Sequence, residues 1–221
     1  MSIILRTLAE QVQPRHTALV VVDMQNDFCE QGGYLQRTRA ESGRNPIRVD
    51  ENAAIAERIG RLAAAARDAG ATVAWLRSIY DYKYLADAHI AMREGEGCCM
   101  EGTWGADFFR IRPQPDDLVV DKHTFSGFHG TNLHEQFQAR GIKTLVMTGV
   151  ATNVCVDSTL RHGFFLGYYI VVAEDCVGSG NRTGHEGTLS TVRVNFGSVV
   201  AAGELLRLFG QHAGAAIGHD R

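Results

Sequence analysis

The sequence has 221 residues, of which 45% are hydrophobic and 21% charged, and this size and composition predict one domain with a single substantial core. Its formal net charge of -3 excludes a broadly basic protein, so we expect neither nucleic acid nor an anionic membrane as a partner. The longest apolar stretch, residues 164–173, is far shorter than the roughly 20 residues that span a bilayer.

The N-terminal residues and the cysteines indicate the compartment. The first sixteen residues, MSIILRTLAEQVQPRH, lack the apolar core of a signal peptide, so we expect no secretion. An odd number of scattered cysteines does not suggest a disulfide framework. We therefore expect a cytoplasmic protein with reduced thiols at Cys29, Cys98, Cys99, Cys155 and Cys176.

From residue 17 onward, short β-branched runs alternate with helical patterns, which is typical of parallel strands joined by helical crossovers. The pattern predicts an α/β fold whose strands cover residues 18–22, 72–76, 118–121, 144–148, 168–173 and, more weakly, 198–201.

The clearest helical pattern covers residues 51–70, where apolar residues recur near helical spacing and Gly70 suits the position after a helix. Similar patterns predict helices over 132–140, ended by Gly141, and over 202–208. Residues 80–115 have no clean periodicity and contain several glycines and prolines. We expect this segment to cross one edge of the sheet as a long functional loop.

Three polar side chains follow predicted strands at their carboxyl ends, the edge where open parallel sheets bind ligands. Asp23 ends ALVVVD, Lys122 ends LVVDK, and Cys155 follows TLVMT through the turn GVATNV. Cys155 would lie near the start of a helix, where the dipole and free N–H groups favour a thiolate. A carboxylate that takes the thiol proton and a cation that stabilises the anions would make a nucleophilic site.

Other interpretations remain open for each of these residues. Taken alone, Asp23 suits a turn and Lys122 suits an exposed surface charge. Cys176 also follows a predicted strand and is the competing nucleophile, although it lacks the glycine-containing turn. We interpret Cys29, Cys98 and Cys99 as structural or lid residues.

Three motifs carry a resemblance to the isochorismatase-like cysteine hydrolases, and together they span residues 17–201: ALVVVDMQNDF, VVDKHTFSGFHGTNL and VMTGVATNVCVDSTLRHGFFLGYYIVVAEDC. The resemblance implies a three-layer α/β sandwich around a six-stranded parallel sheet, in one domain over residues 1–221. It also implies a catalytic triad of Asp23, Lys122 and Cys155.

The resemblance further implies a cis peptide between Val150 and Ala151 and an oxyanion hole formed by the amides of Ala151 and Cys155. In the implied mechanism Asp23 takes the proton of Cys155, the thiolate adds to a carbonyl carbon, an amine leaves, and water cleaves the thioester.

Two departures from relatives narrow the expected chemistry. Nicotinamidases hold a metal with an Asp-x-His pair after the second strand, whereas this chain has Arg77, Ser78 and Ile79 there. We therefore expect no metal and no cofactor. Isochorismatases proper cleave a vinyl ether and do not use a cysteine at the position of Cys155, so its presence favours amide hydrolysis.

The motifs look closest to ureidoacrylate amidohydrolases and to biuret and triuret hydrolases, which act on small ureido compounds and release ammonia or a small amine. N-carbamoyl amino acid amidohydrolases remain an alternative, as does an isochorismatase-type vinyl ether hydrolase in which Cys155 is incidental. A third, different class is a catalytically silent fold that binds a ligand or partner through the same pocket. The sequence does not decide whether the substrate carries a carboxylate.

Four further residues are candidates for substrate binding. Phe28 and Trp104 are the preferred pocket walls, because a flat aromatic ring suits a planar ureido group. Phe128 follows the Lys122 loop, and Arg77 could meet a substrate carbonyl or carboxylate, although packing and a structural ion pair are alternatives. The nine histidines show no metal-ligand spacing and receive no role. The resemblance also implies a homo-oligomer, a dimer or tetramer.

Overall fold

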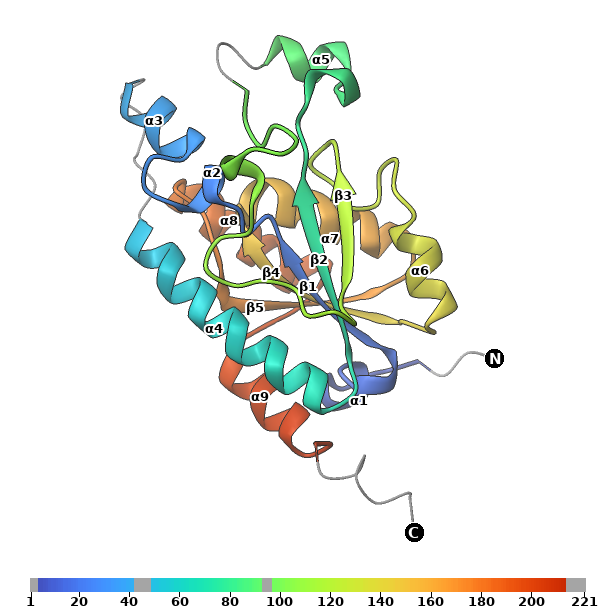
Figure 1. The fold of residues 1–221 in the computed structure, drawn as a ribbon. Coiled ribbons are helices and arrows are strands. Elements are labelled where there is room, and N and C mark those ends of the chain that lie inside the picture. Colours follow the sequence, from blue (N-terminus) through green and yellow to red (C-terminus); the bar gives the residue numbers. More distant parts are fainter. Residues whose placement is uncertain (1–3, 42–48, 93–96, 214–221) are drawn as a thin grey trace.

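A computed structural model describes residues 4–41, 49–92 and 97–213. Its centre is a sheet of six parallel strands in the order β3-β2-β1-β4-β5-β6, drawn in Figure 1. The strands are β1 (Thr17–Val22), β2 (Thr72–Ser78), β3 (Leu118–Lys122), β4 (Thr144–Val150), β5 (Tyr169–Gly178) and β6 (Gly197–Val200). The six-stranded parallel sheet expected from the sequence is confirmed.

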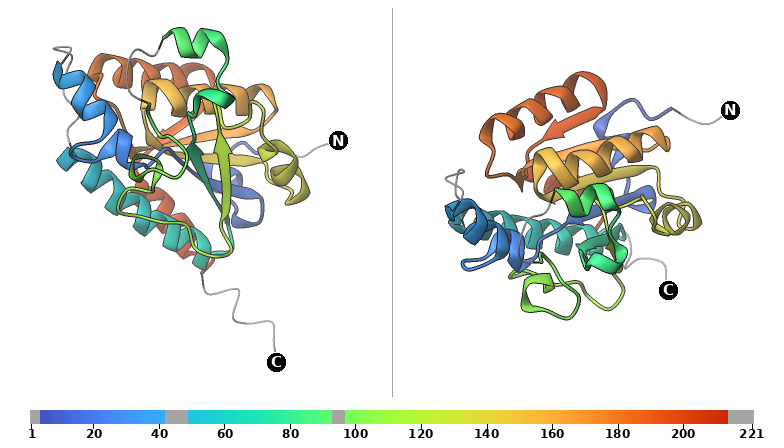
Figure 2. Two further views of the ribbon diagram at one scale, coloured as in Figure 1. Left: turned by 45° about the horizontal axis from the view of Figure 1, so that its top comes forward. Right: turned by 90° about the horizontal axis from the view of Figure 1, so that it is seen from above.

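Alternation along the strands creates two separate apolar layers, because successive side chains point to opposite faces of a sheet. Leu19 and Val21 of β1 belong to one buried cluster, whereas Ala18 and Val20 belong to the other. The first layer packs under α4 (Val49–Asp68) and α9 (Ala202–Gly210), and the second under α6 (Leu133–Ala139), α7 (Asp157–Phe165) and α8 (Arg182–Asn195). Figure 2 shows the sheet between these two groups of helices, which confirms the three-layer sandwich.

Glycines end two of the predicted helices as expected. Gly70 follows α4 with a φ of 82°, and Gly141 follows α6 with a φ of 66°, a left-handed conformation that glycine adopts without a steric penalty. Helix α8 has no counterpart among the predicted helices. Its sequence RTGHEGTLSTVRVN is rich in glycine, serine and threonine, which are poor helix formers, and it begins at the side-chain cap of Asn181.

Strand β5 extends beyond the predicted end at Ala173. The register shifts where Met147 pairs with Val172 and Gly149 pairs with Val177, so β5 carries extra residues across an irregularity. The charged residues directly after the predicted end, Glu174 and Asp175, form ion pairs with side chains of neighbouring helices.

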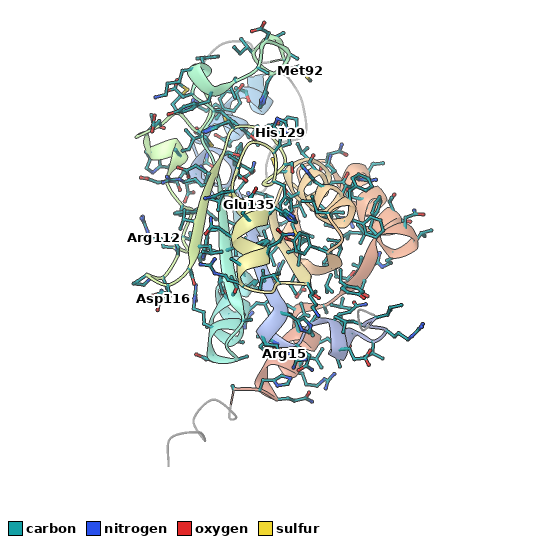
Figure 3. The ribbon with its side chains drawn as sticks, turned by 90° about the vertical axis from the view of Figure 1, so that its right-hand side faces the viewer. Arg15, Met92, Arg112, Asp116, His129 and Glu135 are labelled. Carbon is teal, nitrogen blue, oxygen red and sulfur yellow. The ribbon has the colours of Figure 1, made fainter. Side chains whose placement is uncertain are left out.

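The segment over residues 80–115 crosses the edge of the sheet, as the sequence predicts, and its described residues, 80–92 and 97–115, contain no long helix. It contains α5 (Asp87–Ala91) and two 3-10 turns (Tyr82–Tyr84 and Trp104–Ala106). In Figure 3, Met92 of this segment and His129 lie at the end of the molecule toward which β2 and β3 point, and Arg15 and Asp116 lie at the opposite end.

The N-terminal third contributes the remaining short elements: α1 (Leu8–Gln11), a 3-10 turn (Pro14–His16), α2 (Asn26–Cys29) and α3 (Tyr34–Glu41). Helix α2 and the 3-10 turn at Trp104–Ala106 pack side by side at the carboxyl edge of the sheet. Within the described part of the chain, no helix is both long and apolar enough to cross a membrane.

Candidate active site

A buried ion pair lies at the carboxyl edge of the sheet. Lys122, the last residue of β3, donates from Nζ to Asp23 Oδ2 over 2.8 Å, and the two side chains are 0% and 1% exposed. Asp23 follows β1 with a φ of 51°, an uncommon conformation that aspartate tolerates better than most residues. Its backbone N–H donates to Leu76 O at 3.0 Å, which fixes the turn against β2.

Ser78 bridges the two charges, because β2 lies between β1 and β3 in the sheet. The Ser78 hydroxyl donates to Asp23 Oδ1 at 3.0 Å and accepts from Lys122 Nζ at 2.8 Å. A third bond from Lys122 Nζ reaches Thr124 O at 3.1 Å. All three ammonium protons therefore have acceptors, so this lysine is held as a fixed charge.

The strand register explains why Ser78 belongs to the site and Arg77 does not. Ser78 pairs with Lys122 across the β2–β3 ladder, and Arg77 pairs with Asp121 one step earlier, so the two pairs face opposite sides of the sheet. Arg77 donates from Nε and Nη2 to the Asp121 carboxylate at 2.7 and 2.8 Å. Its guanidinium is thus engaged in a structural ion pair, the alternative that the sequence left open.

Cys155 enters the site from the neighbouring strand β4. Gly149 lets β4 approach β1 closely: its φ is 100°, and a Cβ there would lie 2.0 Å from Val22 O. The Val150–Ala151 peptide is cis, as the resemblance implies. A π-helical turn over Thr152–Val156 then leads into α7, which places Cys155 within the first helical turn.

The charges around Cys155 determine its protonation. The pKa of the Cys155 thiol is raised to about 12, mainly by burial. The nearby Asp23 carboxylate also raises this pKa, and its effect is larger than the lowering by the Lys122 ammonium. Burial lowers the pKa of Lys122, but Asp23 and Cys155 more than compensate, and the net shift is upward. The resting site therefore holds a protonated thiol beside a carboxylate–ammonium pair, so a nucleophilic thiolate forms only when a base takes its proton.

A cavity of about 190 Å³ opens above these groups. Asp23, Ala151 and Cys155 line it, and so does Phe28, one of the predicted aromatic walls. The other described lining residues come from seven stretches of the chain: Tyr34, Leu35, Asn52, Tyr80, Cys98, Phe125, Val150, Val154, Gly178, Ser179 and Gly180.

Two other aromatic candidates lie outside this lining. Trp104 is 52% exposed on the surface of the long loop. Phe128 is buried in the second apolar layer, where its ring stacks on Tyr168 and packs edge-on against Phe137. The geometry therefore gives Trp104 and Phe128 no contact with the cavity, and their predicted role in substrate binding has no structural support.

Tyr80 is a site residue that the sequence reasoning did not identify. Its hydroxyl lies 3.9 Å from Cys155 Sγ, its ring lies 5.6 Å from Lys122 Nζ, and it contacts Phe28 edge-on. It lies two residues after Ser78, the last residue of β2. The alternation of side chains along a strand could have identified both residues. Ser78 pairs with Lys122, and Tyr80 lies two residues beyond Ser78, so alternation places its side chain on the same side.

The cysteines other than Cys155 differ in their position relative to the cavity. Cys29 and Cys176 are buried in the first apolar layer, and burial raises the pKa of Cys176 to about 12. Cys176 lies inside β5 and not beyond its end, which removes the reason for considering it as a nucleophile. Cys98, by contrast, contributes to the cavity wall.

His123 and His129 also lie outside the described lining of the cavity. His123 makes a hydrogen bond from Nδ1 to Ile79 O and stacks on Tyr84, so it ties the long loop to the sheet. His129 is exposed.

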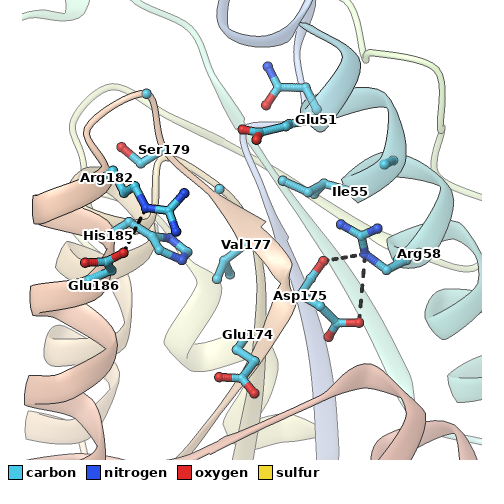
Figure 4. A pocket seen from close by; sticks show the side chains of 14 residues that line it. Glu51, Ile55, Arg58, Glu174, Asp175, Val177, Ser179, Arg182, His185 and Glu186 are labelled. Carbon is cyan, nitrogen blue, oxygen red and sulfur yellow. Dashed lines mark hydrogen bonds and ion pairs between the residues drawn. The ribbon is translucent and has the colours of Figure 1, made fainter. Parts of the chain in front are cut away.

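A larger hollow of about 710 Å³ adjoins the cavity and shares Asn52 and Gly178–Gly180 with it. Figure 4 shows it between α4, the end of β5 and α8. Its charged residues are largely paired with one another, as in the Arg58–Asp175 and Arg182–Glu186 contacts. His185 on this wall makes a 2.8 Å hydrogen bond to Thr152, which supports the turn that carries Cys155.

A parallel α/β sheet with a buried carboxylate, ammonium and thiol at its carboxyl edge defines a hydrolytic enzyme of the α/β class. The chain belongs to the isochorismatase family: the model of the isochorismatase domain matches residues 17–204. The resemblance inferred from the three motifs is thereby confirmed.

Curated relatives and solved structures agree with this assignment. Ureidoacrylate amidohydrolase RutB from Cronobacter sakazakii is 40% identical, over 73% of this chain and 74% of its own. The relative of the same name from Methylorubrum extorquens is 38% identical, over 83% and 78%. A cysteine hydrolase from Pseudomonas syringae pv. phaseolicola superimposes with a TM-score of 0.80 at 28% identity, over 96% of this chain and 100% of its own.

Proposed function

We propose that this chain is an amidohydrolase that cleaves a C–N bond of a small carbamoyl or ureido compound through a thioester on Cys155. The observation that carries the proposal is the buried Asp23–Lys122 pair, whose carboxylate residue lines the same cavity as Cys155. Relatives named for ureidoacrylate hydrolysis at about 40% identity support the ureido class of substrate.

In the proposed first step, the Cys155 proton moves to Asp23 while sulfur bonds to the substrate carbonyl carbon. The carbonyl oxygen becomes an oxyanion, and the backbone N–H groups of Ala151 and Cys155 stabilise it, a contribution of about 3–4 kcal/mol per donor in other enzymes. Lys122 holds the Asp23 carboxylate in position through its 2.8 Å hydrogen bond to Oδ2.

In the second step the C–N bond breaks, and Asp23 returns the proton to the departing nitrogen, so that ammonia or a small amine leaves. Water then adds to the thioester carbon, Asp23 takes its proton, and the C–S bond breaks. The thiolate recovers the proton from Asp23, and the acid product is released. The site returns to its starting protonation, so the cycle is balanced without a metal or redox partner.

The test measures ammonia release by purified protein in EDTA, with biuret, triuret, ureidoacrylate, N-carbamoyl amino acids and nicotinamide as substrates. Cys155→Ala is the inactivating variant. Cys176→Ala is its matched control, because it removes another buried cysteine outside the cavity. Turnover of one ureido compound that is lost only in Cys155→Ala supports the proposal; activity that survives Cys155→Ala contradicts the thioester.

The thioester itself is tested by mass spectrometry of the intact protein after acid quenching during turnover. The expected result is a mass increase equal to the acyl part of the substrate, located on the peptide that contains Cys155. Silence toward every ureido compound, combined with hydrolysis of isochorismate, would favour the vinyl ether alternative.

A further inference from the structure

A cluster of sulfur and oxygen donors lies beside the catalytic cavity and has no part in the proposed reaction. Asp27, Cys98 and Cys99 are all buried, and one ligand atom from each lies within 4.8 Å of the others. The cluster joins α2 to the long loop. Cys98 also lines the cavity, so the cluster can be reached from it.

The two sulfur atoms are spaced for a shared metal ion. Cys98 Sγ and Cys99 Sγ lie 3.9 Å apart, and no disulfide joins them. Two sulfurs at this separation, each about 2.3 Å from one Zn²⁺, subtend an S–Zn–S angle of about 116°, close to the tetrahedral value of about 109°. The pair therefore needs little movement to chelate a cation.

Backbone contacts hold the third donor in place. Asp27 Oδ1 accepts from Tyr34 N at 2.9 Å, and Oδ2 accepts from Cys99 N at 2.6 Å. Each carboxylate oxygen can accept a further bond, so both remain able to bind a cation. Gly105 packs against this carboxylate so closely that a Cβ there would lie 2.2 Å from Oδ2.

We propose that Asp27, Cys98 and Cys99 form a binding site for a thiophilic divalent cation such as Zn²⁺ or Cd²⁺. Three protein ligands match the ligand number of non-structural zinc sites, in which water or another small ligand takes the fourth position. Binding displaces one proton from each thiol, so two protons are released per ion and affinity rises with pH. The occupied site carries a net charge of -1, from one divalent cation, two thiolates and one carboxylate.

The site has a regulatory consequence that rests on the proposed function. An ion held at Cys98 occupies the wall of the cavity in which Cys155 would meet its substrate. Such an ion obstructs the cavity, so Zn²⁺ is expected to inhibit turnover. Cation binding itself does not depend on the reaction, and the test below measures binding without substrate.

The experiment titrates Cd²⁺ into reduced Cys155→Ser protein, which lacks the catalytic thiol, and follows the ultraviolet absorbance of cadmium–thiolate bonds. We expect saturation at one ion per chain, with two protons released. Adding Cys98→Ser or Cys99→Ser should weaken binding at least about tenfold. Adding Cys29→Ser or Cys176→Ser should leave the titration unchanged, because these thiols lie in the apolar layer.

A second measurement avoids substitutions in the cluster. X-ray absorption of Zn²⁺-loaded Cys155→Ser protein should show two sulfur neighbours at about 2.3 Å together with oxygen neighbours. Fewer than two sulfurs, or a Cd²⁺ titration of unchanged affinity in folded Cys98→Ser protein, would overturn the site. Intact binding with no effect of Zn²⁺ on turnover would refute the inhibitory role while leaving the proposed reaction standing.

Discussion

Replacing Lys122 with methionine tests whether water is excluded from the ion pair between Lys122 and Asp23. At an effective dielectric constant of about 20, charges 2.8 Å apart attract by about 6 kcal/mol. Methionine fills similar space but removes the cation from the buried Asp23 carboxylate, which keeps the Ser78 hydroxyl as a donor. Removing one partner of a buried pair costs about 3–5 kcal/mol. We expect Lys122→Met to lower the free energy of unfolding by that amount and to abolish turnover.

Urea denaturation followed by circular dichroism measures this loss, and a double-mutant cycle with Asp23→Asn assigns it. The double variant Asp23→Asn, Lys122→Met contains no buried charge, so it should recover a large part of the stability lost in Lys122→Met while remaining inactive. A loss below about 1 kcal/mol for Lys122→Met, the range of exposed pairs, would show that water reaches the pair and would refute the reasoning.

Three other perturbations test separate parts of the site and surface. Alkylation of Cys155 by iodoacetamide should accelerate up to about pH 12, because burial raises its pKa to about 12; a plateau near pH 8.5, typical of a free thiol, would contradict this. Ser78→Ala should lower the free energy of unfolding in urea by about 1–3 kcal/mol and should lower kcat. Arg77→Met should lower the free energy of unfolding by under about 1 kcal/mol and leave KM unchanged. A larger loss of stability and activity in Arg77→Met than in Ser78→Ala would place Arg77 in the site. Light scattering should give the molecular mass of the predicted dimer or tetramer. Phe165→Ser removes a ring that is 75% exposed and should shift the measured mass toward that of the monomer. An unchanged mass would exclude this surface as the interface.

Alkaline pH provides a test of the buried thiols in the apolar layer. The folded protein holds the Cys176 proton more tightly than the unfolded chain does, because burial raises its pKa to about 12. Its stabilising effect is therefore complete below the pKa of an unfolded cysteine, about 8.5, and is lost as pH rises toward 12. Unfolding free energy measured in urea should fall less steeply with pH in Cys176→Ala; an identical slope would contradict the shift.

The sequence predicted the sheet well because its central strands, β1 and β4, are short apolar runs buried on both faces. It did not predict the end of β5, where Glu174 and Asp175 are tolerated inside the strand by pairing with Arg193 and Arg58. Those partners lie on other elements, so no local pattern reveals them. Helix α8 was missed for a related reason, since tertiary packing of Leu189 and Val192 overrides weak helix propensity.

The site was predictable where chemistry follows directly from a strand end. The sequence placed Asp23, Lys122 and Cys155 at one edge, and the structure brings all three to it. The choice between neighbouring residues required the strand register: Arg77 has the more conspicuous side chain, but Ser78 faces Lys122. Trp104 illustrates the limit of prediction within a long loop, because nothing local distinguishes a ring that faces the cavity from one that faces solvent.

The motif D-x-Q-x-D after β1 has a physical explanation in three separate tasks. Asp23 is the carboxylate of the buried ion pair with Lys122. Gln25 donates to Ser78 O and Ala106 O at 2.9 Å and accepts from Ser78 N, so it fixes the end of β2 and the long loop together. Asp27 holds the loop through Cys99 N. Gln25 positions Ser78, which bridges Asp23 and Lys122, so the geometry of the ion pair depends on a further side chain of the motif. This dependence explains why a motif of alternating polar residues, and not Asp23 alone, marks this site.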